Sequence, residues 1–230
     1  MNAQDPSTRL AAERMPYRTG RLADEAAPDP LALFDAWMAE AFERRDSHGD
    51  LPEPTAVVLS TISTDADDRA RPRSRTVLLK ARDRRGFVVY TNLDSDKGRE
   101  VAASPVASLL LPWFPLQRQV RIEGQVEQVD AEEADAYFAS RPRGSQIGAW
   151  ASRQSRPVAS REVLEEQYAE AQARFEGGQV PRPRHWGGLR IVPDRIEFWQ
   201  GRENRLHDRI VYRRPGGPDG GGWQRERLQP

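Results

Sequence analysis

Hydrophobic periodicity begins only after the first 30 residues. Residues 1–30 are polar, rich in Pro and Ala and without an apolar repeat, so we expect a mobile amino-terminal arm. Asp29 and Pro30 are typical of a helix start. The residues after them carry apolar side chains at helical spacing, namely Leu31, Phe34, Trp37, Met38 and Phe42. The pattern predicts an amphipathic helix that opens a single domain spanning residues 31–230.

Short stretches of alternating or β-branched apolar residues then predict strands. The first five are expected at 55–64, 73–81, 86–92, 106–114 and 117–130. Four closing strands are expected at 187–193, 195–201, 209–214 and 223–230. Because short turns join most neighbouring strands, the pattern favours antiparallel pairing.

Four further helices interrupt the strands. They are expected at 95–104, at 131–141, from Pro142 through 152, and at 161–178, where Gly-Gly ends the last one. The regular strand–helix alternation of a parallel sheet is absent. We therefore expect a mainly β fold, a small antiparallel barrel with helices packed outside it.

Composition excludes several classes of protein. The 35 basic and 35 acidic residues cancel, which argues against a protein that coats nucleic acid. The chain has no cysteine, so disulfides, thiolate nucleophiles and Cys-based metal sites are excluded, and the three histidines form no metal-binding motif. No apolar run is long enough for a membrane span and none near the amino terminus resembles a secretory signal, so we expect a cytoplasmic location and no bound metal.

A row of cationic residues stands out in WQGRENRLHDRI (199–210). If this segment is extended, Arg205, His207 and Arg209 lie on one face. Such a row is costly unless something anionic or rich in π electrons faces it. The indole of Trp199, beside the row, could pack on a flat ring.

Lysine is rare in this chain. Of the 35 basic residues only Lys80 and Lys97 are lysines, and all the others are arginine. Lys97 falls in the first turn of a predicted helix, where a cation is unfavourable unless an anion binds there. Lys80 ends the strand SRTVLLK, and its position fits either a ligand site or a side chain that reaches for solvent at the barrel rim.

The segment YFASRPRGSQ supplies a second candidate anion site. Tyr137, Arg141 and Ser145 are spaced four residues apart around Pro142. They could bind a phosphate group with one guanidinium and two hydroxyls, or they could form an ordinary capping and turn cluster. A phosphorylated aromatic cofactor together with a phosphorylated substrate would account for all of these clusters.

Several motifs resemble those of the pyridoxamine 5′-phosphate oxidase family, FMN enzymes that make pyridoxal 5′-phosphate. They are RTVLLK, VYTNLDSDKG, LPWFPLQRQVRIEG, SRPRGSQIGAW, HWGG, RLHDR and the terminal RLQP, and the likeness runs from about residue 14 to the end. The resemblance implies an FMN-binding split antiparallel β-barrel, Greek-key-like, that forms a homodimer with FMN at the interface. It also implies oxidation of pyridoxamine or pyridoxine 5′-phosphate by O2, producing H2O2 and, from the amine, NH3.

The resemblance assigns roles residue by residue. The implied FMN contacts are Arg75, Thr76, Val77, Leu78, Leu79, Lys80, Tyr90, Thr91, Lys97, Gln119, Gln154, Ser155, Trp199 and Arg209. The implied ligands of the substrate phosphate are Lys80, Tyr137, Arg141 and Ser145. Arg205 and His207 would cover the pyridine ring as the catalytic pair, and Arg14 and Tyr17 would belong to an arm that closes over the site.

One position departs from the family pattern. Asp96 stands where the family usually has Arg, directly before the phosphate-binding Lys97, and a carboxylate there would repel the FMN phosphate. Arg99 could substitute for the missing cation, but we expect weaker FMN binding than is usual for the family.

Three other functions remain open at this stage. They are a related split-barrel flavoenzyme such as a phenazine-pathway oxidase or flavin reductase, a non-catalytic carrier of pyridoxal phosphate or FMN, and an Arg-rich RNA-binding protein.

Overall fold

The computed structural model describes residues 16–18, 20–23, 26–217 and 221–230. Within them the helices are α2 (Pro30–His48), α3 (Asp96–Ala103), α4 (Ala131–Ser140), α5 (Arg143–Ala151) and α6 (Arg161–Arg174), with short 3-10 turns η1 (Phe114–Leu116) and η2 (Glu203–Arg205). The strands are β1 (Ala56–Thr64), β2 (Ala70–Arg82), β3 (Phe87–Asn92), β4 (Val106–Trp113), β5 (Arg118–Gln128), β6 (Trp186–Gln200), β7 (Asp208–Arg213) and β8 (Gln224–Leu228).

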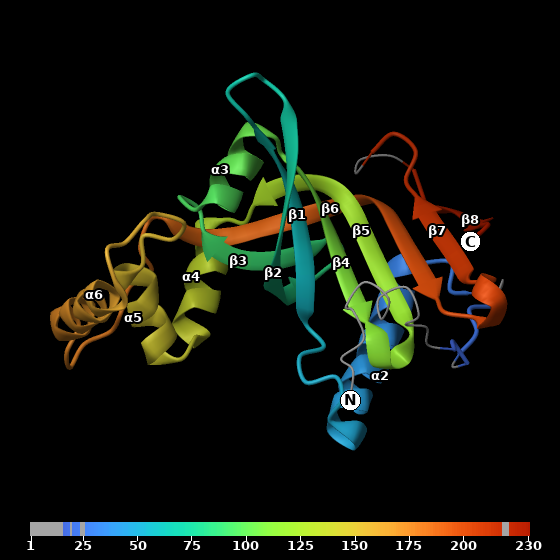
Figure 1. The fold of residues 1–230 in the computed structure, drawn as a ribbon, viewed down its shortest axis with the longest axis horizontal. Helices are drawn as coiled ribbons and strands as arrows, with labels where there is room; N and C mark the ends of the chain where they lie inside the picture. Colours follow the sequence, from blue (N-terminus) through green and yellow to red (C-terminus); the bar gives the residue numbers. More distant parts are fainter. Residues whose placement is uncertain (1–15, 19, 24–25, 218–220) are drawn as a thin grey trace, which may run out of the picture.

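All eight strands belong to one antiparallel sheet. Their order is β3-β2-β1-β4-β5-β6-β7-β8, and β3 also pairs with β6. This extra pairing joins Phe87 with Ile191 and Asn92 with Trp186, so six strands close into a ring while β7 and β8 extend from it (Figure 1). The prediction of a mainly β antiparallel fold with helices outside is confirmed, although the closure is ring-like rather than that of a regular barrel.

Strand β6 differs from the sequence-based expectation. Two strands were expected, at 187–193 and 195–201, but the structure has one continuous strand from Trp186 to Gln200. The pairing with β5 shifts register between Glu123 and Gly124, where Pro193 faces Gly124 and Arg195 faces Glu123. The proline interrupts the sequence pattern but not the strand, because the irregularity accommodates it.

Helix α2 covers one end of the core. Asp29 accepts a hydrogen bond from the backbone N–H of Leu31 and thereby caps the helix. The buried rings of Phe34 and Trp37 contact Phe87 and Phe198 edge-on, at centroid distances of 4.8 and 5.2 Å. The same core includes Leu22, so the described part of the predicted arm packs on the sheet, and the boundary at residue 30 stays a prediction.

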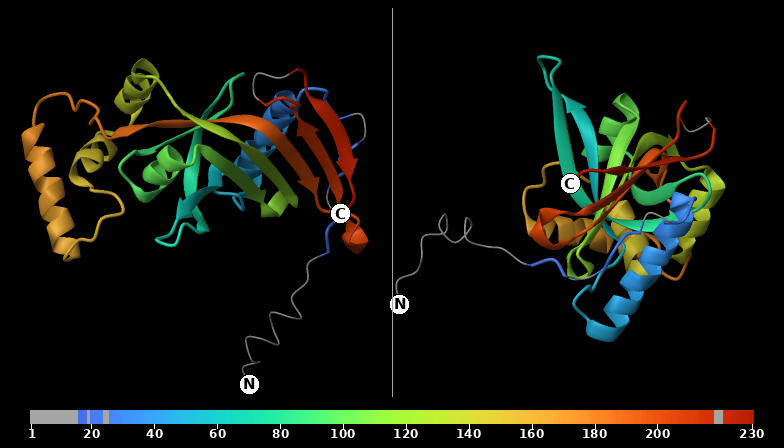
Figure 2. Two further views of the ribbon diagram at one scale, coloured as in Figure 1. Left: turned by 90° about the horizontal axis from the view of Figure 1, so that it is seen from above. Right: turned by 90° about the vertical axis from the view of Figure 1, so that its right-hand side faces the viewer.

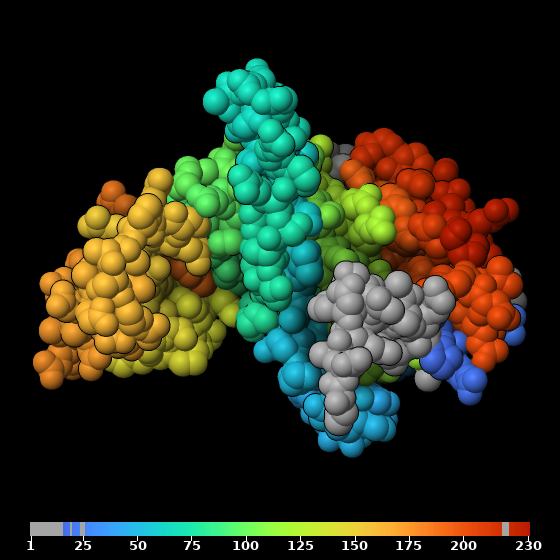
Figure 3. All heavy atoms as spheres, in the orientation of Figure 1, coloured from blue at the N-terminus to red at the C-terminus, as the bar shows by residue number. Residues whose placement is uncertain are grey.

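Helices α4, α5 and α6 form a lobe at the opposite end of the molecule from β7 and β8 (Figure 2). Helix α6 ends at Arg174, four residues before the predicted end at 178. Arg143 of α5 donates hydrogen bonds to the carbonyl oxygens of Phe175 and Gly178, so the residues after α6 fold into a turn instead. The β1–β2 hairpin projects separately from this lobe (Figure 3). No helix within the described ranges is both long and apolar enough to cross a membrane.

Gly124→Ala should destabilise the fold, because the added Cβ would lie 2.0 Å from the carbonyl oxygen of Val192 on β6. Overpacking of this kind costs roughly 1–3 kcal/mol, and each kcal/mol lowers the Tm of a domain this size by about 2–4 °C. Gly148→Ala is the matched control, because a Cβ at Gly148 meets nothing within 4 Å and Ala favours a helix. Equal melting temperatures for both variants would contradict the close approach of β5 and β6.

Candidate functional site

A cavity of about 940 Å³ lies where β2, β3 and α3 face the helical lobe. Most of the predicted ligand residues line it, although they come from distant parts of the chain. Those predicted are Arg75, Thr76, Val77, Leu78, Lys80, Tyr90, Thr91, Lys97, Tyr137, Arg141, Ser145, Gln154 and Ser155. The closure of the sheet at β3 and β6 therefore brings together two clusters that the sequence showed separately.

One end of this cavity is cationic. Lys97 is 9% exposed, and its Nζ lies 2.9 Å from Oε1 of Gln154 and 3.3 Å from Oγ of Ser95. Burial and then the nearby positive charge of Arg75 lower the pKa of Lys97. A bound anion between the two cations would remove this repulsion and stabilise the charged lysine.

Arg75 is held in place from behind. Its guanidinium donates to Oε2 of Glu100 at 2.7 Å, and Thr61 donates to the same oxygen. Burial raises the pKa of Glu100, but the hydrogen bonds from Thr61 and Arg75 outweigh it and hold that pKa below its usual value. The fixed carboxylate orients Arg75 and cancels part of its charge.

Asp96, the residue that departs from the family pattern, pairs with a side chain close to it in the sequence. Asp96 lines the cavity, and its carboxylate accepts a hydrogen bond from Arg99, whose guanidinium also donates to the carbonyl oxygen of Asp94. The residues lining the cavity do not include Arg99. Arg99 thus neutralises Asp96 without itself reaching the cavity wall.

The other end of the cavity holds an arginine with spare hydrogen-bonding capacity. Arg141 lies with its guanidinium 4.7 Å from the ring centre of Trp186, and burial lowers its pKa. Its Nη1 is buried and has no hydrogen-bond partner among the described residues. Such an unsatisfied charged donor is costly unless a ligand accepts its hydrogen bond.

Aromatic rings form the wall beside Arg141. Tyr90 stacks on Tyr137 at 4.0 Å and on Trp186 at 5.3 Å. Burial and the negative charge of Glu133 raise the pKa of Tyr90 to about 12, so its hydroxyl remains a neutral donor. Ser145 lies in the first turn of α5, after Pro142 as N-cap. The hydroxyl and guanidinium groups predicted for a phosphate therefore line one cavity wall.

Two of the predicted strand residues differ in placement. Lys80 is exposed and lines the cavity rim. Leu79 is buried in the core, and it is the member of the 75–80 segment that does not line the cavity. Alternation along β2 does not explain the difference, because Arg75 and Val77 share a face with Leu79 and both line the cavity.

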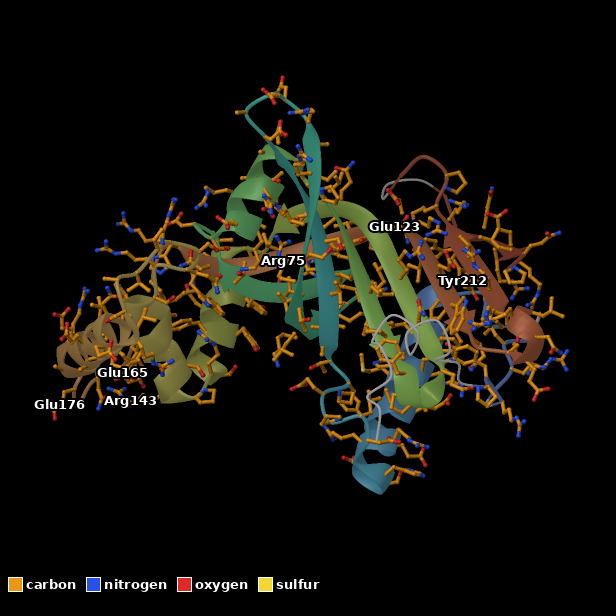
Figure 4. All side chains as sticks on the ribbon, in the orientation of Figure 1. Arg75, Glu123, Arg143, Glu165, Glu176 and Tyr212 are labelled. Atoms are coloured by element: carbon orange, nitrogen blue, oxygen red, sulfur yellow. The ribbon has the colours of Figure 1, made fainter. Side chains whose placement is uncertain are left out.

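A second, smaller cavity of about 240 Å³ contains the remaining predicted flavin contacts. Its lining residues are Gln119, Arg121, Glu197, Trp199, Arg209 and Pro230, none of which line the larger cavity. Figure 4 shows Arg75 on β2 well apart from Tyr212 on β7, the strand that carries Arg209 of the smaller cavity.

Buried Glu197 organises this second cavity. It is 3% exposed and accepts hydrogen bonds from Arg195 at 2.5 Å and from Arg209 at 2.8 Å. Burial raises its pKa, but the bonds from the two arginines prevail and lower it overall. Arg209 is therefore fixed in orientation by a carboxylate, as Arg75 is in the larger cavity.

The expected row of Arg205, His207 and Arg209 on one extended face is wrong. Arg205 belongs to the 3-10 turn η2, and both Asn204 and Arg205 have positive φ, at 57° and 63°. Only Arg209 lies in a strand, β7. The turn breaks the two-residue period on which the expectation was based.

His207 and Arg205 still lie near the second cavity. The ring of His207 is 4.6 Å from that of Trp199, and the ring of Tyr17 stands edge-on to both. The guanidinium of Arg205 is 6.0 Å from the centre of the Tyr17 ring. Arg14, the other predicted arm residue, lies outside the described residues.

Sequence reasoning missed Glu100, Glu197 and Trp186. Glu100 on α3 pairs with Arg75 on β2, and Glu197 on β6 pairs with Arg209 on β7, so these contacts between separate elements leave no local spacing to indicate them. Trp186 is part of the HWGG motif, but only its stacking on Tyr90 explains why it lines the cavity. Across the described residues, no group of three or more acidic or histidine side chains could hold a metal ion.

Comparison with known proteins identifies relatives over nearly the whole chain. Residues 48–175 match the model described as pyridoxamine 5′-phosphate oxidase, and residues 186–230 match the pyridoxine 5′-phosphate oxidase C-terminal dimerisation region. A pyridoxine/pyridoxamine 5′-phosphate oxidase from Rubrobacter xylanophilus is 54% identical, with 96% of each chain covered. One from Thermosynechococcus vestitus is 52% identical, covering 97% of this chain and 100% of the relative.

Among solved structures, PhzG from Burkholderia lata 383, in complex with tetrahydrophenazine-1-carboxylic acid, is similar at a TM-score of 0.81 and 32% identity. The match covers 92% of this chain and 99% of that one. An FMN-binding protein from Nostoc punctiforme, 15% identical with a TM-score of 0.64 over 92% of this chain and all of its own, shares the fold.

Glu197→Gln should lower stability at neutral pH. The substitution weakens charge-assisted hydrogen bonds to Arg195 and Arg209, a loss of about 2 kcal/mol. Because the folded pKa of Glu197 is lowered, its contribution is present above the unfolded pKa and is lost as pH falls through the folded value. In thermal melts the Tm of the variant should therefore lie below that of the wild type at pH 7, and this difference in Tm should narrow below about pH 4.

The matched control is Glu226→Gln on the same sheet. Glu226 pairs with Arg213 at 2.7 Å, but both side chains are about half exposed, so the variant should lose less than about 1 kcal/mol. A difference in Tm between Glu197→Gln and the wild type that did not change with pH, or that equalled the difference for the control, would contradict this role for the buried carboxylate.

Proposed function

Because the chain belongs to the pyridoxamine 5′-phosphate oxidase family, we propose that it oxidises pyridoxamine and pyridoxine 5′-phosphate to pyridoxal 5′-phosphate with FMN and O2. The products are H2O2 and, from the amine, NH3. The main support is the pair of anion sites at two ends of one cavity, one at Arg75 and Lys97 and the other at Arg141. A reaction between a phosphorylated cofactor and a phosphorylated substrate needs such a pair.

The cofactor phosphate fits the end with Arg75 and Lys97. Lys97 is a buried cation whose pKa is lowered by burial and by Arg75, and the negative charge of a dianion would offset both effects. The N-terminus of α3 adds backbone N–H groups and the positive end of the helix dipole. Gln154 and Ser155 close this end from the segment after α5.

The substrate phosphate fits the end with Arg141. Its buried Nη1 lacks a partner among the described residues, and a phosphate oxygen would satisfy it. Tyr137 and Ser145 line the same wall, and Lys80 contributes a cation at the rim. Stacking on Trp186 orients the guanidinium, and within the described part of the chain no carboxylate forms an ion pair with it.

The protein contributes mainly orientation to this reaction. When bound, FMN supplies the hydride acceptor and returns the electrons to O2. The two phosphate sites fix the ends of both molecules, which turns an encounter into a geometry suited to transfer from C4′ of the vitamer. Arg205 and His207 would cover the ring of the substrate and hold C4′ in position for the transfer.

We further propose a homodimer in which each flavin site uses two chains. Gln119, Trp199 and Arg209 line a cavity that shares no residue with the one holding Arg75 and Lys97. Trp199 and Arg209 also lie within the segment that matches a dimerisation region. If a partner subunit supplies Gln119, Trp199 and Arg209, one flavin can contact the residues of both cavities.

A second candidate is oxidation of a carboxylated phenazine precursor, favoured by the similarity to PhzG. Both candidates need the same flavin end of the cavity. A carboxylate could also accept from Arg141, but Tyr137, Ser145 and Lys80 beside it supply further donors that suit the three oxygens of a phosphate. A non-catalytic carrier would bind FMN or pyridoxal phosphate without producing peroxide.

Purified protein should be yellow with bound FMN and should form pyridoxal 5′-phosphate and H2O2 from pyridoxine 5′-phosphate under air. Arg141→Gln should retain FMN but raise KM for this substrate by roughly 10- to 100-fold, because one charge-assisted phosphate contact is lost. Arg161→Gln, on the exposed start of α6, is the control and should behave as wild type.

The outcomes separate the candidates. Turnover of tetrahydrophenazine-1-carboxylic acid but not of pyridoxine phosphate would favour the phenazine-type reaction. FMN binding with no peroxide from either substrate would indicate a carrier.

Asp96→Arg should tighten FMN binding. The substitution removes a carboxylate from the cavity wall and supplies a guanidinium next to Lys97, a gain of roughly 1.5–3 kcal/mol. Fluorescence titration of apoprotein with FMN measures the change, with Asp94→Arg, outside the cavity lining, as the control. An unchanged dissociation constant would contradict the expectation that Asp96 weakens FMN binding.

A further inference from the structure

Strand β6 carries a fully buried arginine that belongs to neither cavity. Arg190 is 2% exposed and lies where β6 pairs with β3. Its Nη2 donates to both carboxylate oxygens of Glu133, at 2.8 and 2.7 Å, and its Nη1 donates to Asp83 at 2.7 Å. None of these three residues lines either of the two cavities. The buried charge is therefore paired with carboxylates outside the site itself.

These ion pairs connect three elements of the fold. Arg190 belongs to β6, Glu133 to the first turn of α4, and Asp83 to the turn between β2 and β3. Asp83 is itself fixed, because its carboxylate also accepts hydrogen bonds from the backbone N–H groups of Arg85 and Gly86. The guanidinium of Arg85 donates to Glu133 as well, at 3.2 Å. Helix α4 is therefore attached by its first turn to the part of the sheet where the ring closes.

Helix α4 also carries part of the proposed phosphate site. Glu133, Tyr137 and Arg141 are four residues apart, so they follow one face of the helix, with Arg141 as its C-cap. Tyr137 and Arg141 line the larger cavity, and Tyr137 stacks on Tyr90 of β3 at 4.0 Å. The anchored carboxylate and the two candidate phosphate ligands therefore belong to one rigid element.

Apolar packing leaves the rotation of α4 about its axis weakly determined. Ala134 is buried in a small apolar cluster, and contacts of this kind have no preferred direction. Asp135 on the same helix pairs with Arg182, but its side chain is 60% exposed, and exposed ion pairs contribute little. A charge-assisted hydrogen bond to a buried guanidinium is directional. The ion pair between α4 and β6 is therefore the contact that sets the orientation of the helix.

We propose that the ion pair between Glu133 and Arg190 orients α4 so that Tyr137 and Arg141 reach the phosphate of the substrate. The role rests on the proposed function, in which Arg141 binds that phosphate. Because neither Glu133 nor Arg190 lines the cavity, both are positioning residues that act through the helix. A buried ion pair adds little stability relative to apolar side chains of similar size, so its contribution here is its fixed geometry.

Glu133→Gln tests the role with little change in size. The amide is uncharged and has one acceptor oxygen where the carboxylate has two, so α4 is held less firmly. KM for pyridoxine 5′-phosphate should rise roughly tenfold, because a small misplacement of a positioned group can cost up to about 100-fold. The flavin end is carried by β2 and α3, so kcat and the FMN content, measured from flavin absorbance, should stay within about twofold of wild type.

Glu132→Gln is the matched control. It removes the same charge from the same turn of α4, but Glu132 is exposed, so its kinetic constants should equal those of the wild type. An unchanged KM in Glu133→Gln would overturn the proposal. An equal rise in KM for both variants would also overturn it, because the charge at the start of the helix would then be responsible.

A double variant separates positioning from stability. Glu133→Gln combined with Arg190→Met removes both charges of the pair, and Asp83 keeps Arg85 as a partner. With no unpaired charge left in the core, the melting temperature should stay close to that of the wild type, while KM should be raised as in the single variant. A double variant with the wild-type KM, or a KM that rose only together with a loss of FMN, would overturn the positioning role.

Failure of the proposed function gives a different result. Wild-type protein that does not oxidise pyridoxine 5′-phosphate would overturn the proposed function and the positioning role with it. Active wild-type protein whose KM is insensitive to Glu133→Gln would overturn only the positioning role.

Discussion

The pairing of β6 with three different strands is the constraint on which both cavities depend. Its first half pairs with β3, its second half with β7, and β5 runs along both. The pairing with β3 closes the ring and places β2, β3 and α3 opposite the helical lobe, where the larger cavity forms. The second half of the same strand carries Glu197 and Trp199 into the smaller cavity. Because the strand is continuous, a change in its register would move both sets of side chains together.

The arginines of the site are held in two different ways, and the difference suits different tasks. Arg75 is bound to the partly buried carboxylate of Glu100 and Arg209 to the buried carboxylate of Glu197, so their donors are fixed but part of their charge is cancelled. Arg141 instead stacks on Trp186, which orients the guanidinium while leaving its charge for a ligand. A fixed and partly neutralised arginine is suited to a resident group. An uncompensated arginine attracts a substrate that must enter and leave.

The sequence predicted most elements because local patterns determine them. The two-residue alternation of β5 and the stripe on α2 are set by which side chains face the core, and Asp29 marks the helix start by capping it. The continuity of β6 was not predictable, because Pro193 is a typical strand breaker and only its pairing with Gly124 accommodates it. The turn at Asn204 and Arg205 was hard to predict from the sequence, because Asn tolerates positive φ but Arg rarely adopts it. The carboxylates that pair with Arg75 and Arg209 come from different elements, helix α3 and strand β6, so no local spacing encodes these contacts.

The division of the predicted flavin contacts between two cavities has a consequence for assembly. Arg75 and Lys97 belong to one cavity and Trp199 and Arg209 to another, with no lining residue in common. If all four residues contact one flavin, the two cavities of a single chain are each only half of a flavin site. A symmetric pair of chains solves this, because a two-fold axis presents the second cavity of each chain to the first cavity of the other. Dimer formation and cofactor binding would then be linked, because each flavin bridges both chains and stabilises the pair.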